Sequence, residues 1–256
     1  KVISPLLSGV PLQPVDGFPA EMLFKKRTRR KDTPRSYTFV GGLRTLIDGM
    51  AQQPGVTVRN SAQVTALART GDGFALRLRN GESLSARRVA LALPPPQAAT
   101  LLADAAPALA SALRRVRTAA VESVGVVVES AALALPRLMG LVPIDDCFFS
   151  LVTRDVVPHP GLRALTFHFR AGIPLEQRID RICAVTRLER DRFKCLVTHS
   201  ASLPALALGH ADVTREIDQL LPNSGLFVTG NYFGGLAIED CSLRSKHEAQ
   251  RFLRAG

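Results

Sequence analysis

The residues whose types and spacing could do chemistry lie near the carboxyl end of the chain. Leu226 to Val228 is a short apolar run typical of a buried strand, and Gly230 follows it closely. Asn231 to Gly235 then form a turn with two adjacent glycines, before a polar, helix-compatible segment from Ala237 to about Leu253. A strand, a glycine-rich turn and a helix bring backbone amides and a positive helix end to an anionic ligand. Spacing alone leaves open a second reading, a packing turn that binds nothing.

The amino-acid sequence of this stretch is more specific than the strand, turn and helix pattern that it predicts. It resembles the carboxyl-terminal flavin motif of the protoporphyrinogen oxidase family, within the flavin amine oxidase superfamily, in which a Gly-x-x-Tyr-x-Gly-type turn leads into an Asp-Cys pair. The residues at matching places are Gly230, Gly235, Ile238, Asp240 and Cys241. Two positions depart from the motif: Phe233 occupies the Tyr position, and Glu239 replaces a residue that is often proline.

The resemblance implies FAD as the cofactor. The cofactor-binding residues that it implies are Val64, Gly230, Asn231, Gly235, Ala237, Ile238 and Asp240. Val64 would offer its backbone to the adenine. Glu239 or Asp240 would either hydrogen-bond the cofactor or only cap the helix. Catalytic residues are not identified, and no metal site is expected.

The elements that must position this site begin with a second informative stretch, residues 39–96. Leu43, Leu46, Ile47 and Met50 follow Gly41-Gly42 at helical spacing and predict one apolar face of a short helix that ends at Pro54-Gly55. Apolar runs predict strands at 56–58, 62–68, 74–78 and 89–93, with a tight turn at Asn80-Gly81. This order also resembles the flavin superfamily, in which Pro94 and Pro95 would mark the crossing into the substrate domain.

The middle of the chain has the pattern of a sheet with helices. We expect a helix from 97 to about 112, strands at 121–128, 148–153 and 164–170, and a helix over 175–192. Three segments are similar to the same oxidase family: residues 5–9, residues 138–143, and residues 197–210 with Pro204, Gly209 and His210. The aromatic residues that the family has upstream of the last segment are absent here.

These patterns predict a mixed α/β (α+β) fold: a partial FAD/NAD(P)-binding-type domain with a sheet-plus-helix substrate domain. The expected division is a remnant of the substrate or helical domain at 1–38, FAD-binding parts at 39–96 and 223–256, and a substrate-binding domain at 97–222. The Gly-x-Gly-x-x-Gly turn that cradles the FAD diphosphate in this superfamily does not occur in the sequence. We therefore expect a fragment without the first dinucleotide-binding unit, which binds FAD weakly or not at all alone.

The function that the resemblance implies is FAD-dependent oxidation of a porphyrinogen, protoporphyrinogen IX or coproporphyrinogen III, to the porphyrin in heme biosynthesis. Arg114, Arg117 and Arg170 are candidate partners for the propionates of this small-molecule tetrapyrrole substrate. One alternative is another flavin amine oxidase or carotenoid-desaturase-like oxidoreductase. Amine oxidases place aromatic residues around the flavin, and the only tyrosines here are Tyr37 and Tyr232. A second alternative is a non-catalytic chain with the same fold and no cofactor.

Composition limits the remaining classes. The formal net charge of +11 suits an anionic partner, and a basic run from Lys25 to Lys31 is either a solvated segment or a guide for an acidic substrate or a membrane surface. Net charge is the sole argument for nucleic acid, so we expect none. The four cysteines are widely spaced, which favours a reducing, cytoplasmic location, with peripheral contact at the cytoplasmic membrane face as an option. Asp145-Asp146 and the scattered histidines fit solvated groups better than a catalytic pair or a metal site. The oligomeric state is not indicated.

Overall fold

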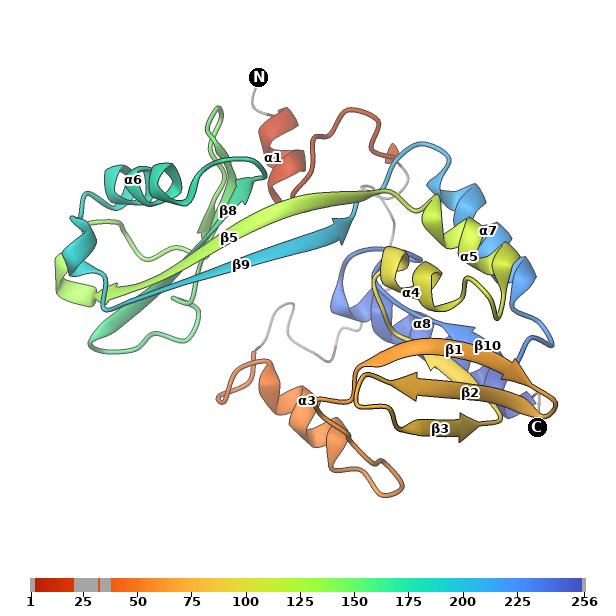
Figure 1. Ribbon diagram of the computed structural model, residues 1–256. Coiled ribbons are helices and arrows are strands. Elements are labelled where there is room, and N and C mark those ends of the chain that lie inside the picture. Colours follow the sequence, from red (N-terminus) through yellow and green to blue (C-terminus); the bar gives the residue numbers. More distant parts are fainter. Residues whose placement is uncertain (1–2, 21–31, 33–37, 255–256) are drawn as a thin grey trace.

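Figure 1 shows the computed structural model, which describes residues 3–20, 32 and 38–254. The basic run from Lys25 to Lys31 and Tyr37 lie outside the described residues. Within these residues the chain is a mixed α/β structure with three sheets of three, two and five strands. This confirms the predicted fold class.

The smallest sheet joins two distant parts of the chain. β4 (Val89–Leu91) and β10 (Leu226–Val228) run parallel, with Phe227 opposite Ala90. The amide of Thr229 extends the pairing by donating to the carbonyl of Leu91 over 3.0 Å. The start of the glycine-rich turn is thus fixed to β4.

The three-stranded sheet is an antiparallel meander of β1 (Val64–Thr70), β2 (Gly73–Leu78) and β3 (Ser83–Ala86). The predicted tight turn between β2 and β3 is present, with Gly81 at a φ of +89°. Leu67 and Phe74 from this sheet reach the same buried cluster as β4 and β10. The meander is therefore packed against the elements that carry the turn.

The five-stranded sheet is antiparallel, in the order β6-β7-β8-β5-β9. Its strands are β5 (Thr118–Glu129), β6 (Gly140–Leu141), β7 (Phe148–Thr153), β8 (Leu162–Arg170) and β9 (Cys195–Pro204). Helix α6 (Leu175–Thr186) covers one face, where Ile182 packs with Phe167 and Phe169 of β8. Two short 3-10 turns, η1 (Ser130–Ala132) and η2 (Arg190–Arg192), lie at the ends of strands in this part.

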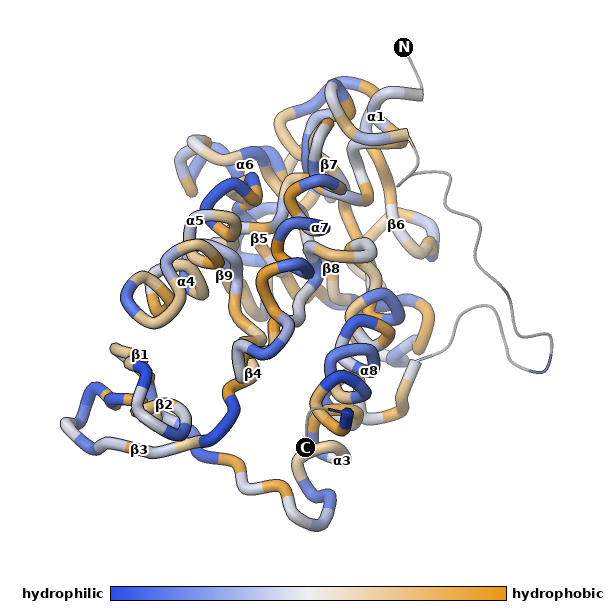
Figure 2. The backbone as a smooth tube through the Cα atoms, turned by 90° about the vertical axis from the view of Figure 1, so that its right-hand side faces the viewer, coloured by the Kyte–Doolittle hydropathy of each residue, from blue (hydrophilic) through white to orange (hydrophobic). Residues whose placement is uncertain are grey.

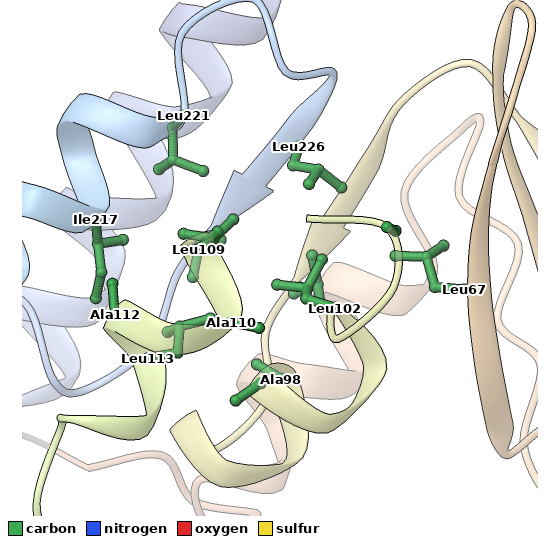
Figure 3. Close-up of a cluster of buried hydrophobic side chains, with 14 of the residues drawn as sticks. Leu67, Ala98, Leu102, Leu109, Ala110, Ala112, Leu113, Ile217, Leu221 and Leu226 are labelled. Carbon is green, nitrogen blue, oxygen red and sulfur yellow. The ribbon is translucent and has the colours of Figure 1, made fainter. Parts of the chain in front are cut away.

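The buried cluster that contains Leu67 and Phe74 also takes in the helices around the parallel pair of strands. Its helices are α4 (Pro95–Leu101), α5 (Pro107–Arg114) and α7 (His210–Leu220). Figure 3 shows Leu102, Leu109 and Leu113 of the α4–α5 region pointing toward Ile217 and Leu226. Burial of these aliphatic side chains is the main force that holds α7 and β10 against the rest.

The remaining helices of the described residues are α1 (Ile3–Gly9), α3 (Arg44–Ala51) and α8 (Ile238–Arg254). Helix α8 follows the glycine-rich turn and carries hydrophilic residues over much of its length, as Figure 2 shows. The helix predicted from the 43–50 spacing is confirmed as α3, yet none of its residues is buried. None of the described helices is long and apolar enough to cross a membrane.

Several sequence-based element predictions need correction. Residues 56–58 form no strand, because no neighbouring strand pairs with them within the described chain. The helix expected over 97–112 is two helices, since Pro107 cannot continue α4 and instead begins α5. The helix expected over 175–192 ends at Thr186, where Arg187 takes a left-handed φ of +58°.

Candidate functional site

The glycine-rich turn begins where β10 ends. Its first glycine, Gly230, cannot be replaced by a residue with a side chain. Gly230 has a φ of +153°, and a Cβ on it would lie 2.5 Å from Cε1 of Tyr232. Both the backbone angle and the close approach therefore demand glycine. The turn can fold back on itself only because this position lacks a side chain.

Tyr232 anchors the turn in the core instead of facing a ligand. Its side chain is 0% exposed and packs with the cluster that includes Ile217 and Leu226. The Nε2 of His210, at the start of α7, lies 2.5 Å from the Tyr232 carbonyl; a carbonyl only accepts, so this nitrogen carries the proton. Burial lowers the pKa of His210, although the bond to the carbonyl opposes that effect. The imidazole is thus a neutral donor that fixes the turn.

Gly235 closes the turn against the carboxylate of Asp240. Its φ is +146°, and a Cβ there would lie 2.4 Å from Oδ2 of Asp240. The same oxygen accepts the amide of Ala237 over 3.2 Å, and Asp240 is 4% exposed. In this arrangement Asp240 caps the amino end of α8 from within. The sequence left two roles open for Asp240, a hydrogen bond to the cofactor or a helix cap, and the structure contains the hydrogen bond of the cap.

The amino end of α8 presents donors that the helix does not use. The first helical hydrogen bond runs from the Cys241 amide to the Ala237 carbonyl over 3.1 Å, so the amides of Ile238 and Glu239 precede the ladder. Both residues have exposed side chains. Together with the helix dipole, these amides favour an electron-rich or anionic group at this end.

A buried charged network ties α8 to β10. Leu226 and Val228 turn their backbone groups away from β4, and side chains of α8 bind them. Glu248 accepts the Val228 amide over 3.2 Å, Arg244 Nε donates to the Val228 carbonyl over 3.0 Å, and Arg251 donates to the Leu226 carbonyl. Arg244 also pairs with Asp218 of α7 at 2.7 Å and lies over the Phe233 ring. The network closes the outer edge of β10 and holds the turn between two helices.

Sequence reasoning missed this network. Polar residues on a helix usually indicate a solvated face, yet Arg244 and Glu248 are both more than nine-tenths buried. Their i,i+4 spacing, with Arg251 three residues further, was the only signal in the sequence.

Two hollows flank this unit. A cavity of about 320 Å³ opens between α7, the turn and the first half of α8, where Phe233, Gly234 and Asp240 contribute to its wall. A more apolar cavity of about 340 Å³ lies between β4, β10 and the second half of α8, with Phe227 and Phe252 in its wall. Within the described chain no strand pairs with the free edge of β4.

Six of the seven predicted cofactor residues lie in one continuous unit: Gly230, Asn231, Gly235, Ala237, Ile238 and Asp240. Val64 lies elsewhere, at the first position of β1, beside an irregularity in its pairing with β2. No hydrogen bond between described residues links Val64 to the turn. The unit fits the ring end of a flavin, because it offers free amides at a helix start, whereas the sequence contains no glycine fingerprint for a diphosphate.

Other candidate residues have plain structural roles or remain on the surface. Asp146 is engaged by Arg181, with 2.6 Å between Oδ2 and Nη2, so the Asp145-Asp146 pair is not a free pair of carboxylates. Arg114 and Arg117 are exposed, and Arg170 stacks on the Phe149 ring at 4.5 Å. Among the described residues no group of histidine, cysteine and acidic side chains could hold a metal ion.

Comparisons with known proteins give one family match and several matches of fold. A profile described as flavin containing amine oxidoreductase matches residues 6–253. The fold is similar to a solved structure named Putative protoporphyrinogen oxidase from Exiguobacterium sp. 255-15, with a TM-score of 0.62 and 20% identity over 82% of this chain. It is also similar to a reduced UDP-galactopyranose mutase (TM-score 0.61, 14% identity, 90% of this chain) and to a putrescine oxidase variant redesigned in cofactor binding (TM-score 0.61, 15% identity, 84% of this chain).

The chain spans little more than half of the solved proteins that it matches. It covers 51% of the first, 59% of the second and 53% of the third. At these identities the likeness is one of fold.

Proposed function

The chain belongs to the family of flavin-containing amine oxidoreductases, and from that premise we propose that it is part of an FAD-dependent oxidase that converts a porphyrinogen to the porphyrin in heme biosynthesis. Protoporphyrinogen IX and coproporphyrinogen III are the two candidate substrates. Flavin-dependent oxidoreduction follows from the family; the porphyrinogen is the proposed specificity.

The observation that carries the proposal is the turn between β10 and α8. It has five residues of the porphyrinogen oxidase motif in order, with Phe233 and Glu239 as the two departures. Its geometry makes both Gly230 and Gly235 necessary. Asp240, the acidic residue of the motif, is buried where it holds the helix start. The fold likeness to a structure named as a protoporphyrinogen oxidase supports the same assignment.

The residues of this chain would hold the cofactor through backbone groups. The amides of Ile238 and Glu239 would donate to it, and the positive end of α8 favours the negative charge that develops on reduction. FAD, when bound, supplies the redox chemistry by accepting hydride equivalents from the reduced tetrapyrrole. The protein's task is then to fix the helix start, through Asp240, and to orient the substrate.

Charge on the sheet offers a partner for substrate carboxylates. Of the three arginines considered, Arg170 has its guanidinium ordered on the ring of Phe149 while it stays exposed. An exposed, pre-positioned guanidinium is suited to a propionate, because little side-chain entropy remains to be lost on binding. We assign Arg170 this role within the proposed function.

An amine substrate is less well supported. The aromatic residues that amine oxidases place around the flavin would need exposed tyrosines, and Tyr232 is fully buried. We expect a porphyrinogen oxidase to need no such set of tyrosines around the flavin. Among the described residues no tyrosine side chain is exposed at the turn, which favours the tetrapyrrole over putrescine-like substrates.

The test is turnover by the protein expressed from its complete reading frame. Bound flavin is measured by its absorbance, and porphyrin formation by fluorescence, with protoporphyrinogen IX and coproporphyrinogen III in parallel with putrescine and cyclohexylamine. We expect bound FAD and oxidation of one porphyrinogen only. Oxidation of an amine instead would transfer the chain to the amine oxidases, and absence of both flavin and turnover would make it a non-catalytic member of the fold.

A further inference from the structure

A small cavity lies beside the loop that joins β7 to β8. Its volume is about 210 Å³, and its wall is formed by this loop, the start of β8 and the facing part of β5. β5 begins after α5, and Figure 1 shows it running from there to the other end of the molecule. Val127, near the end of β5, pairs with Ala164 of β8, and both line the cavity. None of the lining residues belongs to the glycine-rich turn or to α8, so this cavity is separate from the site described above.

A buried ion pair holds the loop in place. Nη2 of Arg163 lies 2.6 Å from Oδ2 of Asp155, and these side chains are only 4% and 5% exposed. The same Oδ2 accepts the amide of Leu138 over 3.3 Å, and Nη2 of Arg163 donates to the carbonyl of Pro136 over 2.9 Å. The loop is thus tied to the segment before β6. The cavity beside it is therefore formed before a ligand arrives, as is usual for small-molecule sites.

Arg154 places a free guanidinium in the wall of the cavity. Its backbone is fixed, because its amide donates to the carbonyl of Ala164 over 3.1 Å and its carbonyl accepts the amide of Val157 over 3.3 Å. The side chain is exposed and lines the cavity. Within the part of the chain that the structure describes, its guanidinium makes no hydrogen bond and no ion pair. All its donors are available to a ligand.

His159 supplies a second donor. Its Nδ1 accepts the amides of Gly161 and Leu162 over 3.2 and 3.1 Å. A ring nitrogen that accepts a hydrogen bond carries no proton, so in the neutral ring the proton is on Nε2. His159 lines the cavity, and its Nε2 has no hydrogen-bond partner among the described residues. The loop thereby fixes both the position of the imidazole and the nitrogen that can donate.

The acidic groups around the cavity are already paired. Asp155 belongs to the wall, but it is held in the buried ion pair, and Arg137 lies 3.7 Å from its Oδ1. Glu129, across from the first residue of β8, pairs with Lys194 at 2.7 Å. The charge of Arg154 is therefore left uncompensated, and the cavity favours an anion.

The rest of the wall is aliphatic and consists of Val127, Val157, Leu162 and Ala164. The volume is about seven times the roughly 30 Å³ that one water molecule occupies in the liquid. We propose that this cavity binds a small carboxylate with a short apolar body, which receives hydrogen bonds from the guanidinium of Arg154 and Nε2 of His159. The fork of an arginine matches a carboxylate in shape, and the aliphatic wall covers the body. A bare inorganic anion would leave that wall unused.

The test is a titration of the protein expressed from its complete reading frame with hexanoate, followed by saturation-transfer-difference NMR of the ligand. Hexanamide has the same body without the charge, acetate has the charge without the body, and phosphate serves as a competitor. Arg154→Gln is compared with Arg187→Gln, since both arginines are exposed but only Arg154 lines the cavity. Val157→Asp is compared with Val156→Asp, because these neighbours are 53% and 56% exposed and only Val157 lines the cavity. His159→Asn keeps an acceptor for the loop amides and removes the Nε2 donor.

We expect saturable binding of hexanoate in about the millimolar range, and at least about threefold weaker binding of hexanamide and acetate. Arg154→Gln, His159→Asn and Val157→Asp should each weaken hexanoate binding by about three- to tenfold, whereas the two control variants should stay within about twofold of the unaltered protein.

The proposal is overturned by an absence of saturable binding or by equal losses within either pair. It is also overturned if hexanamide binds as tightly as hexanoate, or if phosphate binds more tightly than hexanoate. If Arg154→Gln does not fold, the pair at 156 and 157 gives the decision alone. Because neither flavin nor tetrapyrrole enters this assay, its failure is distinct from failure of the proposed function.

Discussion

Replacing Gly235 by alanine is the perturbation whose cost the structure defines best. The new Cβ would lie 2.4 Å from Oδ2 of Asp240 at a φ of +146°. Asp240 cannot simply swing away, because it is buried and accepts the Ala237 amide. Losing that cap costs about 0.5–2 kcal/mol, and the backbone strain about 1–3 kcal/mol. We expect Gly235→Ala to lower the free energy of unfolding by about 1.5–5 kcal/mol, the sum of the two costs.

Urea denaturation followed by circular dichroism measures this difference. Gly172→Ala is the matched control, since Gly172 has a φ of +85° and no atom within 4 Å of its absent Cβ. It carries backbone strain without a collision, so it should cost about 1–2 kcal/mol. The difference between the two variants contains the contact with Asp240 and the difference in backbone strain between a φ of +146° and a φ of +85°.

A double-mutant cycle tests whether the contact with Asp240 causes the loss of stability in Gly235→Ala. In an Asp240→Ala background the collision is gone, so Gly235→Ala should cost about 1 kcal/mol less than in the unaltered chain. Equal costs for Gly235→Ala and Gly172→Ala, with no coupling to Asp240, would refute the reasoning that the carboxylate closes the turn.

Further expectations concern the buried polar groups. Arg244→Met should cost about 1–3 kcal/mol of unfolding free energy, because it removes the donor to the buried Val228 carbonyl and one of the two arginines that pair with the buried Glu248, whereas Arg215→Met removes an exposed pair and should cost at most about 1 kcal/mol in the same titration. Tyr232→Phe removes a buried hydroxyl that has no hydrogen-bond partner among the described residues, so thermal denaturation should show an unchanged or slightly raised midpoint. Burial lowers the pKa of both His168 and His210, so the folded chain binds fewer protons than the unfolded chain just below their ordinary pKa of about 6.5. Stability should therefore fall as the pH drops below that value, and glutamine at both positions should flatten the dependence in urea titrations at several pH values.

The sequence predicted the elements whose patterns are local. The run Leu226 to Val228 is the buried strand β10, and the glycines after it form the predicted turn before α8. Gly230 and Gly235 could be identified because positive φ and close approach leave a mark in residue type. The role of Asp240 could not be predicted from the sequence, because an aspartate can serve equally as a helix cap and as a contact to the cofactor.

Features that depend on tertiary pairing were not predictable in this way. β9 is mostly exposed and lacks a clear apolar alternation, so only its pairing with β5 identifies it as a strand. Helix α7 begins at His210 after Gly209, which has a φ of +80°, and no element was predicted for this segment from the sequence. The buried Arg244 looked like a surface residue, because its partners come from β10 and α7. Whether Val64 meets the cofactor stays a prediction.

The most direct measurement is FAD affinity in the protein expressed from its complete reading frame, for Ile238→Pro against Ile238→Ala. Ile238 is the first residue of α8, a position that accepts proline, so Ile238→Pro removes only the amide donor that Ile238→Ala keeps. We predict that Ile238→Pro binds FAD about three- to tenfold more weakly than Ile238→Ala, with unchanged thermal stability. Equal FAD affinity in the two variants would contradict the claim that the start of α8 holds the flavin.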